Sequence, residues 1–406
     1  MRYISTRGGT PSVDFEGALF SGYASDGGLF MPEEIPQLDR ETLKQWSTLS
    51  YPALVMELCS LFIDPELIPK KDLKGLIGRA FSRFRHRDVV HLSRLKNGLN
   101  VLELWHGITY AFKDLSLSCS GQFLQYFLEK RQKHVTIVVG TSGDTGSSAI
   151  ESVRGAKNID IIVLLPLGLC SKIQELQMTT VIEDNVHVFG AGCIAQEMGL
   201  PVRLATVVNH NDIIHRAVRQ GDFSLSGNTR ASLASAMDIQ VPYNMERIFW
   251  LLSGADSKLV RALMEQFDRT QKLRLPQALH TKISETIDSL SASDEDIIQT
   301  MRRCWEENHY LLCPHSAVAA FYHYKRSASE QPSLTRCCLA PASAVKFQDA
   351  ILQAQLVPEI PEDIQALEHM PTRSNTLCRG DDWTQVLRDK IEDLSQQRRS
   401  GGSSQE

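Results

Sequence analysis

Lys113 lies in the segment WHGITYAFKD (residues 105–114), surrounded by apolar and aromatic residues. A lysine drawn into such a pocket loses the solvation of its ammonium group, so its pKa falls and its amine can form a Schiff base with a carbonyl compound. The alternative is a solvated lysine that opens a helix over residues 115–129, because most lysines lie at the surface. This segment taken alone favours the solvated lysine.

A second candidate site is the segment GTSGDTG (residues 140–146), which follows an apolar run and opens a helix-length stretch. Free backbone N–H groups and the positive end of the helix dipole would make this turn an anion site. Its candidate ligands are Ser142, Gly143, Asp144 and Thr145. The segment is neither a G-x-G-x-x-G fingerprint nor a Walker loop, so no motif supports a nucleotide. A polar turn whose Asp or Thr caps the helix explains the segment equally well.

Together these sites combine a lysine nucleophile with a cradle for phosphate or carboxylate. That combination suits pyridoxal phosphate chemistry, in which a lysine holds the cofactor and also moves protons.

The elements that would position both sites follow the pattern of a parallel sheet. An apolar β-branched run at 135–139 and a similar run at 159–165 enclose a helix that starts near residue 146, which is a βαβ unit. Residues 1–90 are mostly helical by periodicity, and we divide the rest into a catalytic domain (91–380) and a terminal helix with a disordered tail (381–406). The class is therefore α/β. Further elements are expected as helical stretches at 40–59 and 71–84, broken by Pro52, Pro65 and Pro69. Helices are also expected at 171–180, 191–198 and from 382 onward, and strands at 186–189 and 202–208.

Composition restricts the function classes. The chain has 406 residues with a formal net charge of −5, which argues against nucleic-acid binding because that needs a basic surface. Its nine cysteines include no C-x-x-C spacing, so we expect free thiols and no metal site. The apolar runs are too short to span a bilayer, and the N-terminus has no apolar signal region. A cytoplasmic protein without membrane or nucleic-acid partners is expected, of unknown oligomeric state.

Several motifs in order resemble the threonine synthase family, within the tryptophan-synthase-β-like group of pyridoxal enzymes (fold type II). The likeness runs nearly end to end and is strongest to the animal threonine-synthase-like phospho-lyases. The segments that carry it are YISTRG (3–8), DGGLFMP (26–32), HGITYAFKD (106–114), SGDTG (142–146), QELQMT (174–179), NHND (209–212), MDIQ with NMER (237–247) and PHSAV (314–318).

The resemblance assigns roles residue by residue. It places the Schiff base with pyridoxal 5'-phosphate on Lys113 and the substrate on the loop of Ser142, Gly143, Asp144 and Thr145. The segment LAPASAVKF (339–347) resembles the one whose hydroxyl meets the pyridine nitrogen, but Pro341 occupies the place of that hydroxyl. Ser343, two residues on, is the candidate replacement.

One departure from the family is large. After the expected strand ending at Phe189, the family continues through further elements to a Gly/Asn-rich loop that holds the cofactor phosphate. This chain passes from Gly190 directly to a stretch that resembles the helix behind that loop. A segment of roughly 60–90 residues, two to three βα-sized units, is therefore expected to be missing.

The resemblance implies a phospho-lyase that eliminates phosphate from O-phosphothreonine or O-phosphohomoserine and yields 2-oxobutanoate, ammonia and phosphate. In it the Lys113 amine removes the Cα proton, and phosphate leaves from Cβ or Cγ. Two alternatives stay open: threonine synthase proper, with water addition giving threonine, and a catalytically inactive shortened product with a non-enzymatic role.

Overall fold

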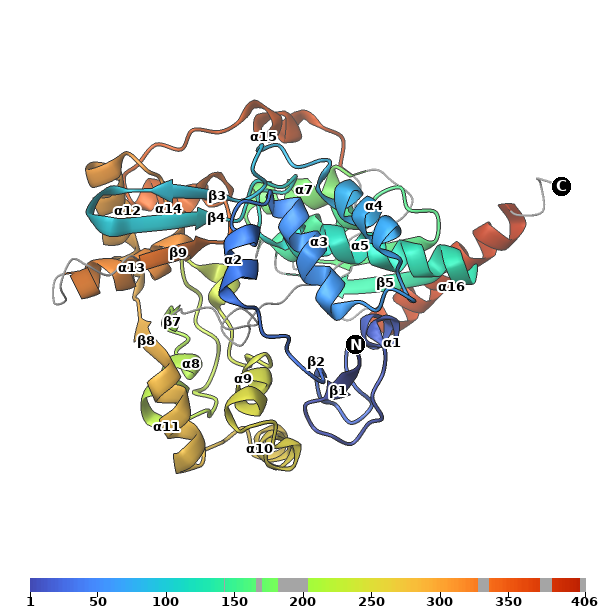
Figure 1. Cartoon of the computed structure of the whole chain (residues 1–406). Helices are drawn as coiled ribbons and strands as arrows, with labels where there is room; N and C mark the ends of the chain where they lie inside the picture. The colour runs from blue at the N-terminus through green and yellow to red at the C-terminus, as the bar shows by residue number, and fades with distance from the viewer. Residues whose placement is uncertain (142, 166–169, 182–203, 328–335, 373–381, 402–406) are drawn as a thin grey trace.

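The computed structural model describes residues 1–141, 143–165, 170–181, 204–327, 336–372 and 382–401 (Figure 1). Helices and strands are mixed along the chain, and three of the strand pairings are parallel, so the predicted α/β class is confirmed. No helix among these residues is long and apolar enough to cross a membrane.

The N-terminal part is mostly helical, as predicted, and carries one small antiparallel ribbon. Strands β1 (Tyr3–Ser5) and β2 (Phe30–Pro32) pair with each other. The helical stretch expected over 40–59 with a break at Pro52 consists of two helices, and residues 47–50 separate them just before this proline. The helices of this part are α1 (Phe15–Ser21), α2 (Arg40–Trp46), α3 (Tyr51–Phe62) and α4 (Lys70–Phe81). Pro52 stands in the first turn of α3, where its missing N–H costs no helical hydrogen bond.

This part is fixed to the rest of the chain at two places. Leu76, Phe81 and their neighbours share one apolar cluster with Phe123 and Phe127 of α5 (Lys113–Arg131). On the other side, Arg7 forms a buried ion pair of 3.1 Å with Glu246 of α9 (Met245–Leu252). The N-terminal residues are therefore packed against the elements that follow.

The predicted βαβ unit is present. It consists of β5 (Val135–Gly140), α6 (Asp144–Val153) and β6 (Ile159–Leu164), with β5 and β6 parallel and in register from Val135 against Ile159. Helix α7 (Lys172–Thr179) and strand β7 (Leu204–Val208) agree with the predictions for 171–180 and 202–208. The strand predicted at 186–189 and the helix at 191–198 lie outside the described residues.

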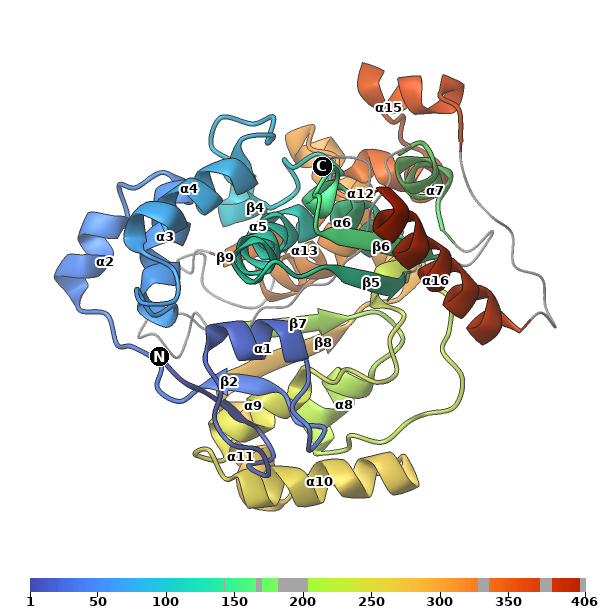
Figure 2. The ribbon, with the colours of Figure 1, turned by 90° about the vertical axis from the view of Figure 1, so that its right-hand side faces the viewer.

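Besides the β1–β2 ribbon, the strands of the described residues form three separate sheets (Figures 1 and 2). Strand β4 (Leu99–Glu103) pairs antiparallel with β3 (His91–Arg94) and parallel with β9 (Arg336–Ala340). Strands β5 and β6 form the second sheet, and β7 pairs parallel with β8 (Ile287–Ser291) in the third.

The second sheet is thinly covered. Parallel sheets are normally buried on both faces. Here Val138 in the apolar strand β5 is 40% exposed, and Ile161 and Val163 of β6 are only half-buried. Apolar side chains of this strand pair are therefore partly open to solvent.

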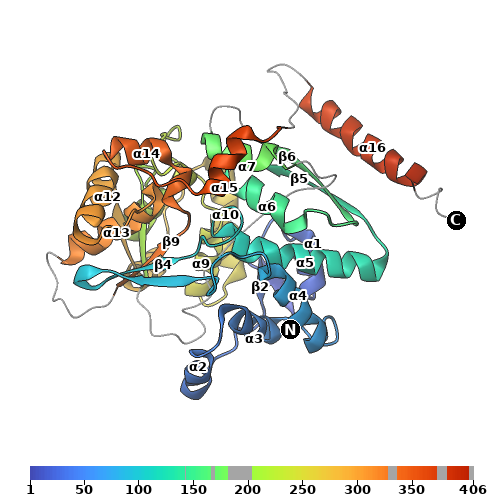
Figure 3. The same cartoon turned by 90° about the horizontal axis from the view of Figure 1, so that it is seen from above.

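The remaining helices enclose the first and third sheets and extend to the C-terminus. The residues around α12 and α13 form the largest apolar cluster with β4 and β9. Their bounds are α8 (Ile213–Gln220), α10 (Ser257–Thr270), α11 (Gln277–Thr286), α12 (Asp294–Asn308), α13 (Pro314–Ser327), α14 (Gln348–Gln353), α15 (Glu362–Ala366) and α16 (Trp383–Gly401), with 3-10 turns at Lys96–Gly98 (η1), Ser235–Met237 (η2), Ala344–Lys346 (η3) and Leu367–His369 (η4). Figure 3 shows α16 projecting from the body.

Close packing of α5 on α6 brings the starts of both helices together. Gly121 permits the approach, since a Cβ at this position would lie 2.3 Å from the carbonyl oxygen of Ser152. Lys113 is the first residue of α5 and Asp144 the first of α6. The tight contact in the middle of these helices therefore places the two residues that the sequence singled out at one end of the same helix pair.

We expect Gly121→Ala to destabilise the protein by about 1–3 kcal/mol, because the added methyl group overpacks the α5–α6 contact. The matched control is Gly78→Ala in α4, where a Cβ meets no atom within 4 Å. That change should stabilise by up to ~1 kcal/mol through helix propensity. Denaturant unfolding monitored by circular dichroism measures both, and equal signs would contradict the packing argument.

Candidate active site

Lys113 opens α5 at the end of a segment that is fixed from outside. The N–H of Phe112 donates to the Pro341 carbonyl at 2.6 Å, and the N–H of Ser343 donates to the Tyr110 carbonyl at 3.1 Å. Between them Ala111 forms an antiparallel bridge with Ala342. The residues before Lys113 are therefore held like one strand of a ribbon, which limits where its side chain can lie.

The Lys113 amine lies in an apolar setting. The side chain is half-buried, and its Nζ is 4.7 Å from the centre of the Phe112 ring. Burial lowers the pKa of Lys113 below its ordinary value, with Lys346 acting in the same direction and Asp144 and Asp114 opposing. Among the described residues, no hydrogen bond or ion pair engages this amine. A desolvated, unpaired amine is the form that acts as nucleophile or base.

Asp114, next to Lys113, has a structural task. Its carboxylate accepts the backbone N–H of Thr109 at 2.8 Å and the Thr109 hydroxyl at 2.7 Å. It is buried, and a Cβ at Gly107 would lie 2.3 Å from its Oδ2. Gly107 is thus required for the turn that Asp114 closes, which explains why the segment before Lys113 contains a glycine.

The loop after β5 is organised by Thr141, which the sequence analysis did not single out. The Thr141 hydroxyl oxygen accepts the N–H of Gly143 at 3.1 Å and that of Gly146 at 2.9 Å. Gly143 has φ 142°, and Gln174 packs on it so closely that a Cβ would lie 2.6 Å from the Gln174 amide. Gly143 is therefore buried backbone, and Ser142 lies outside the described residues.

The N–H groups of Asp144 and Thr145 have no hydrogen-bond acceptor within the part of the chain that the structure describes. They belong to the first turn of α6, where the helix dipole adds positive potential. Thr145 is half-buried, whereas Asp144 is buried. Of the four predicted substrate residues, Asp144 and Thr145 thus present the free donors that anion binding requires.

Asp144 is also the centre of a buried network. Its Oδ1 accepts from the amide of Gln174 at 2.7 Å and from the ammonium of Lys346 at 2.7 Å. Burial acts to raise the pKa of this carboxyl, but Lys346 and Lys113 outweigh it and lower the pKa to about 2. Asp144 is therefore ionised at neutral pH with its charge compensated.

Lys346 is the residue of the site that the sequence analysis missed. It belongs to the 3-10 turn Ala344–Lys346, its side chain is 0% exposed, and its Nζ also donates to the Thr109 carbonyl at 2.6 Å. A lysine in that turn carries no signal of burial in the sequence, because lysines are almost never fully buried unless they are paired. Only the fold brings the partner of Lys346 within reach.

His315, in the first turn of α13, is the other buried group near this network. Its Nε2 accepts the N–H of Ala236 at 3.1 Å, so the ring proton is on Nδ1, which has no hydrogen-bond partner within the described residues. Burial lowers the pKa of His315 to about 4, with Asp144 opposing this shift and Lys113 and Lys346 adding to it. The ring is therefore neutral at pH 7 and holds one unused donor.

Ser343 lies beside the segment that carries Lys113, because its N–H is bonded to the Tyr110 carbonyl. Its side chain is half-buried, and its hydroxyl makes no hydrogen bond within the described residues. Pro341 offers only its carbonyl, which the N–H of Phe112 occupies. Ser343 is thus the available hydroxyl of this segment, as the sequence suggested.

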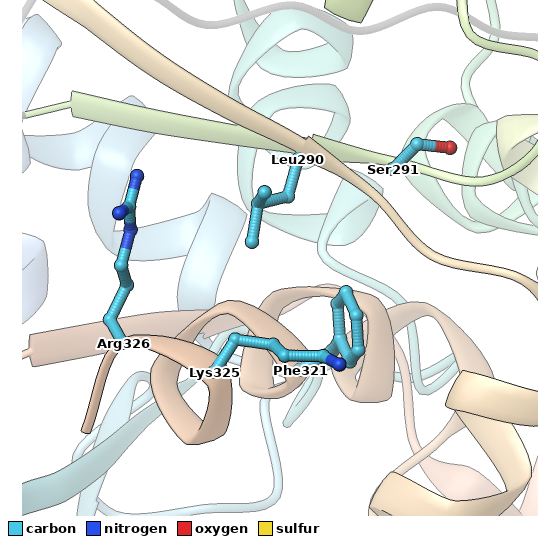
Figure 4. A pocket seen from close by; sticks show the side chains of 5 residues that line it. All are labelled: Leu290, Ser291, Phe321, Lys325 and Arg326. Atoms are coloured by element: carbon cyan, nitrogen blue, oxygen red, sulfur yellow. The ribbon is translucent and has the colours of Figure 1, made fainter. Parts of the chain in front are cut away.

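Two other features do not belong to this site. A hollow of about 180 Å³ lies between β8 and α13, lined by Leu290, Ser291, Phe321, Lys325 and Arg326 (Figure 4), and contains none of the residues described above. A surface cluster of His86, Asp88 and His91 has ligand atoms within 4.8 Å of one another. However, Nδ1 of His86 accepts the Asp88 N–H, which leaves the ring proton on Nε2 and no free lone pair for a metal.

Comparison with known proteins extends over almost the whole chain. The N-terminal region of threonine synthase matches residues 2–81, and its C-terminal region matches residues 316–388. Threonine synthase-like 2 of Homo sapiens is 61% identical over 98% of this chain and 99% of the relative. Threonine synthase of Schizosaccharomyces pombe is 32% identical over 86% of this chain and 88% of the relative.

The human alignment also bears on length. It spans 477 positions but includes 98% of the 406 residues here, about 400 residues, so roughly 80 aligned positions have no counterpart in this chain. The number falls within the range expected for a missing segment.

Solved structures agree with the sequence relatives. Yeast threonine synthase superposes with a TM-score of 0.91 at 29% identity, covering 98% of this chain and 99% of that one. Threonine synthase from Brucella melitensis, solved with pyridoxal phosphate bound, superposes with a TM-score of 0.90 at 27% identity, covering 97% and 99%. The predicted type II fold is thereby confirmed, and the chain belongs to the threonine synthase family.

Proposed function

We propose that this chain is a pyridoxal-phosphate-dependent phospho-lyase that converts a β- or γ-phosphorylated amino acid to 2-oxobutanoate, ammonia and phosphate. Family membership supports the cofactor, because a related threonine synthase was solved with it bound. The observation that carries the proposal is the unpaired, desolvated amine of Lys113 in the same network as the open N-terminus of α6.

The residues present fit the aldehyde end of the cofactor. Lys113 offers an amine that no neighbour within the described residues engages, and His315 keeps a buried Nδ1–H without an acceptor. A buried donor left unpaired costs about 1–3 kcal/mol, which a bound polar group would offset. When bound, pyridoxal phosphate supplies an aldehyde for the lysine and a ring that accepts electron density from Cα.

The fit at the ring nitrogen is weaker. Pro341 has no hydroxyl to donate, and Ser343 must serve if any residue of this segment does. A ring nitrogen without a firm donor draws less electron density from Cα. Reactions that need few proton transfers are then favoured over longer sequences.

The cofactor phosphate is the third point of contact. Apart from the loop after β5 and the turn of Gly8 and Gly9 after β1, which packs on Ser257 and Arg261 of α10, the described residues include no glycine-rich turn that follows a strand. We place the roughly 80 unmatched positions after Gly190, where the family loop for this phosphate would begin. The chain therefore anchors the cofactor mainly through Lys113.

The reaction itself needs little from the protein. The N–H groups of Asp144 and Thr145 bind the anionic group of the substrate at the start of α6. The neutral amine of Lys113 then takes the Cα proton, the electron pair forms the Cα=Cβ bond, and phosphate leaves from Cβ. The released enamine hydrolyses in water to 2-oxobutanoate and ammonia.

Elimination of phosphate from O-phosphothreonine requires fewer proton transfers than elimination from O-phosphohomoserine. Loss of a β-phosphate requires removal of one proton, from Cα, whereas loss of a γ-phosphate also requires one from Cβ. Formation of threonine also requires the addition of a water molecule. The weak ring-nitrogen contact therefore favours the phospho-lyase over threonine synthase proper.

Lys113→Ala is expected to abolish the visible absorbance that the protein acquires with pyridoxal phosphate. It should lower phosphate release from O-phosphothreonine at least about a hundredfold, since general base catalysis contributes 10²–10⁴. The matched control, Lys133→Ala, removes an exposed lysine just beyond α5 and should change neither. The proposal fails if the folded wild-type chain never acquires the absorbance and borohydride traps no adduct at Lys113.

Because the phosphate contact is missing, we expect the chain to bind pyridoxal and pyridoxal phosphate with Kd values within about tenfold of each other. Several charge-assisted hydrogen bonds to phosphate, at about 1.5–3 kcal/mol each, would separate them by far more. Spectral titration of the two aldehydes measures the ratio. A preference for the phosphate ester above about a hundredfold would show that another part of the chain supplies the cradle.

A further inference from the structure

The charges around Lys113 are distributed unequally. Three charged groups act on it: Asp144 of α6, Lys346 of the turn η3 and Asp114 of α5. The Asp114 carboxylate is bound to Thr109, so it is not a ready counter-ion. Asp144 is therefore the carboxylate that could pair with the Lys113 ammonium.

Asp144 is engaged elsewhere. Its Oδ1 lies 2.7 Å from the Lys346 ammonium, and the Gln174 amide holds the same oxygen at 2.7 Å. Lys346 is fully buried and has a second acceptor, the Thr109 carbonyl at 2.6 Å. Both groups are thus fixed by several contacts, so the carboxylate is not free to turn toward Lys113.

This arrangement has a chemical consequence. An amine paired with a carboxylate stays protonated, and a protonated amine can neither attack an aldehyde nor accept the Cα proton. A second ammonium that takes the carboxylate removes that pairing and adds like-charge repulsion. Burial lowers the pKa of Lys113 and Lys346 adds to this shift, while Asp144 and Asp114 oppose it.

We propose that Lys346 is a positioning residue of the active site, which binds Asp144 and thereby weakens the pairing of this carboxylate with the Lys113 amine. The inference rests on the proposed role of Lys113 and adds the residue that competes with that amine for Asp144. Lys346 touches neither substrate nor cofactor, since its amine is occupied by Asp144 and Thr109.

The test measures the protonation of Lys113 directly, without cofactor. The full chain is labelled with trace acetic anhydride across a pH series, and the Lys113 peptide is quantified by mass spectrometry. Lys346→Met should move the labelling midpoint of Lys113 upward by about one unit or more, because Asp144 then pairs with Lys113. Lys74→Met, which removes an exposed lysine of α4, should leave the midpoint in place.

A double variant separates the effect of the Lys346 charge from a structural disturbance caused by its replacement. In Lys346→Met/Asp144→Asn neither buried charge remains, so the midpoint should fall back toward the wild-type value. An unchanged midpoint in folded Lys346→Met, or a double variant that stays as high as the single one, would overturn the proposal.

If Lys346→Met alone does not fold, the effect of the Lys346 charge is tested in the Asp144→Asn variant instead. Asp144→Asn should lower the midpoint of Lys113, and adding Lys346→Met to it should raise the midpoint again. No rise in that background refutes the inference. A wild-type chain whose Lys113 labels as a low-pKa amine but forms no adduct with pyridoxal refutes the proposed function and leaves the role of Lys346 standing.

Discussion

The buried ion pair between Lys346 and Asp144 is the interaction on which the candidate site depends. It joins the start of α6 to the turn η3, and through the Thr109 carbonyl it reaches the segment that precedes α5. A buried pair of this kind contributes little net stability, because desolvation of two charges offsets their attraction. Its effect is geometric, since each charge can be satisfied in only one arrangement of the three segments.

The network around this pair extends through neutral groups. Gln174 holds Asp144 and closes over Gly143, while Gln177 donates to the same Thr109 carbonyl at 3.2 Å. Helix α7 is therefore linked to both candidate loops, although neither glutamine would be recognised as part of a site by its chemistry. These contacts fix the backbone and leave the ends of α5 and α6 open to a ligand.

Strands β5 and β6 are incompletely covered. They have the apolar composition of strands buried on both faces, yet within the described residues they pair with each other alone, and Val138 stays 40% exposed. The alignment with the human relative contains positions that have no counterpart in this chain. Under the proposed function, the reacting amine of Lys113 precedes the place that we propose for these positions.

The sequence by itself determined the α/β class, the βαβ unit around β5, α6 and β6, and the candidacy of Lys113, because these depend on local periodicity and on motifs in a fixed order. The family resemblance favoured Lys113 as the Schiff-base lysine over the alternative of a solvated lysine. The structure places its amine in an apolar setting. The break between α2 and α3 was expected at Pro52 and lies a few residues earlier, because proline is tolerated in the first turn of a helix and helix boundaries are the least precise part of such a prediction.

Only the tertiary structure decided which polar groups meet. Lys346 and Asp144 are about 200 residues apart in the chain, and nothing in either local sequence indicates that one will neutralise the other. Thr141 as the acceptor inside its own loop, and His315 with an unused donor, are likewise consequences of packing. Burial makes an unpaired charge so costly that partners must be found across the fold, and the identity of those partners is a property of the folded chain.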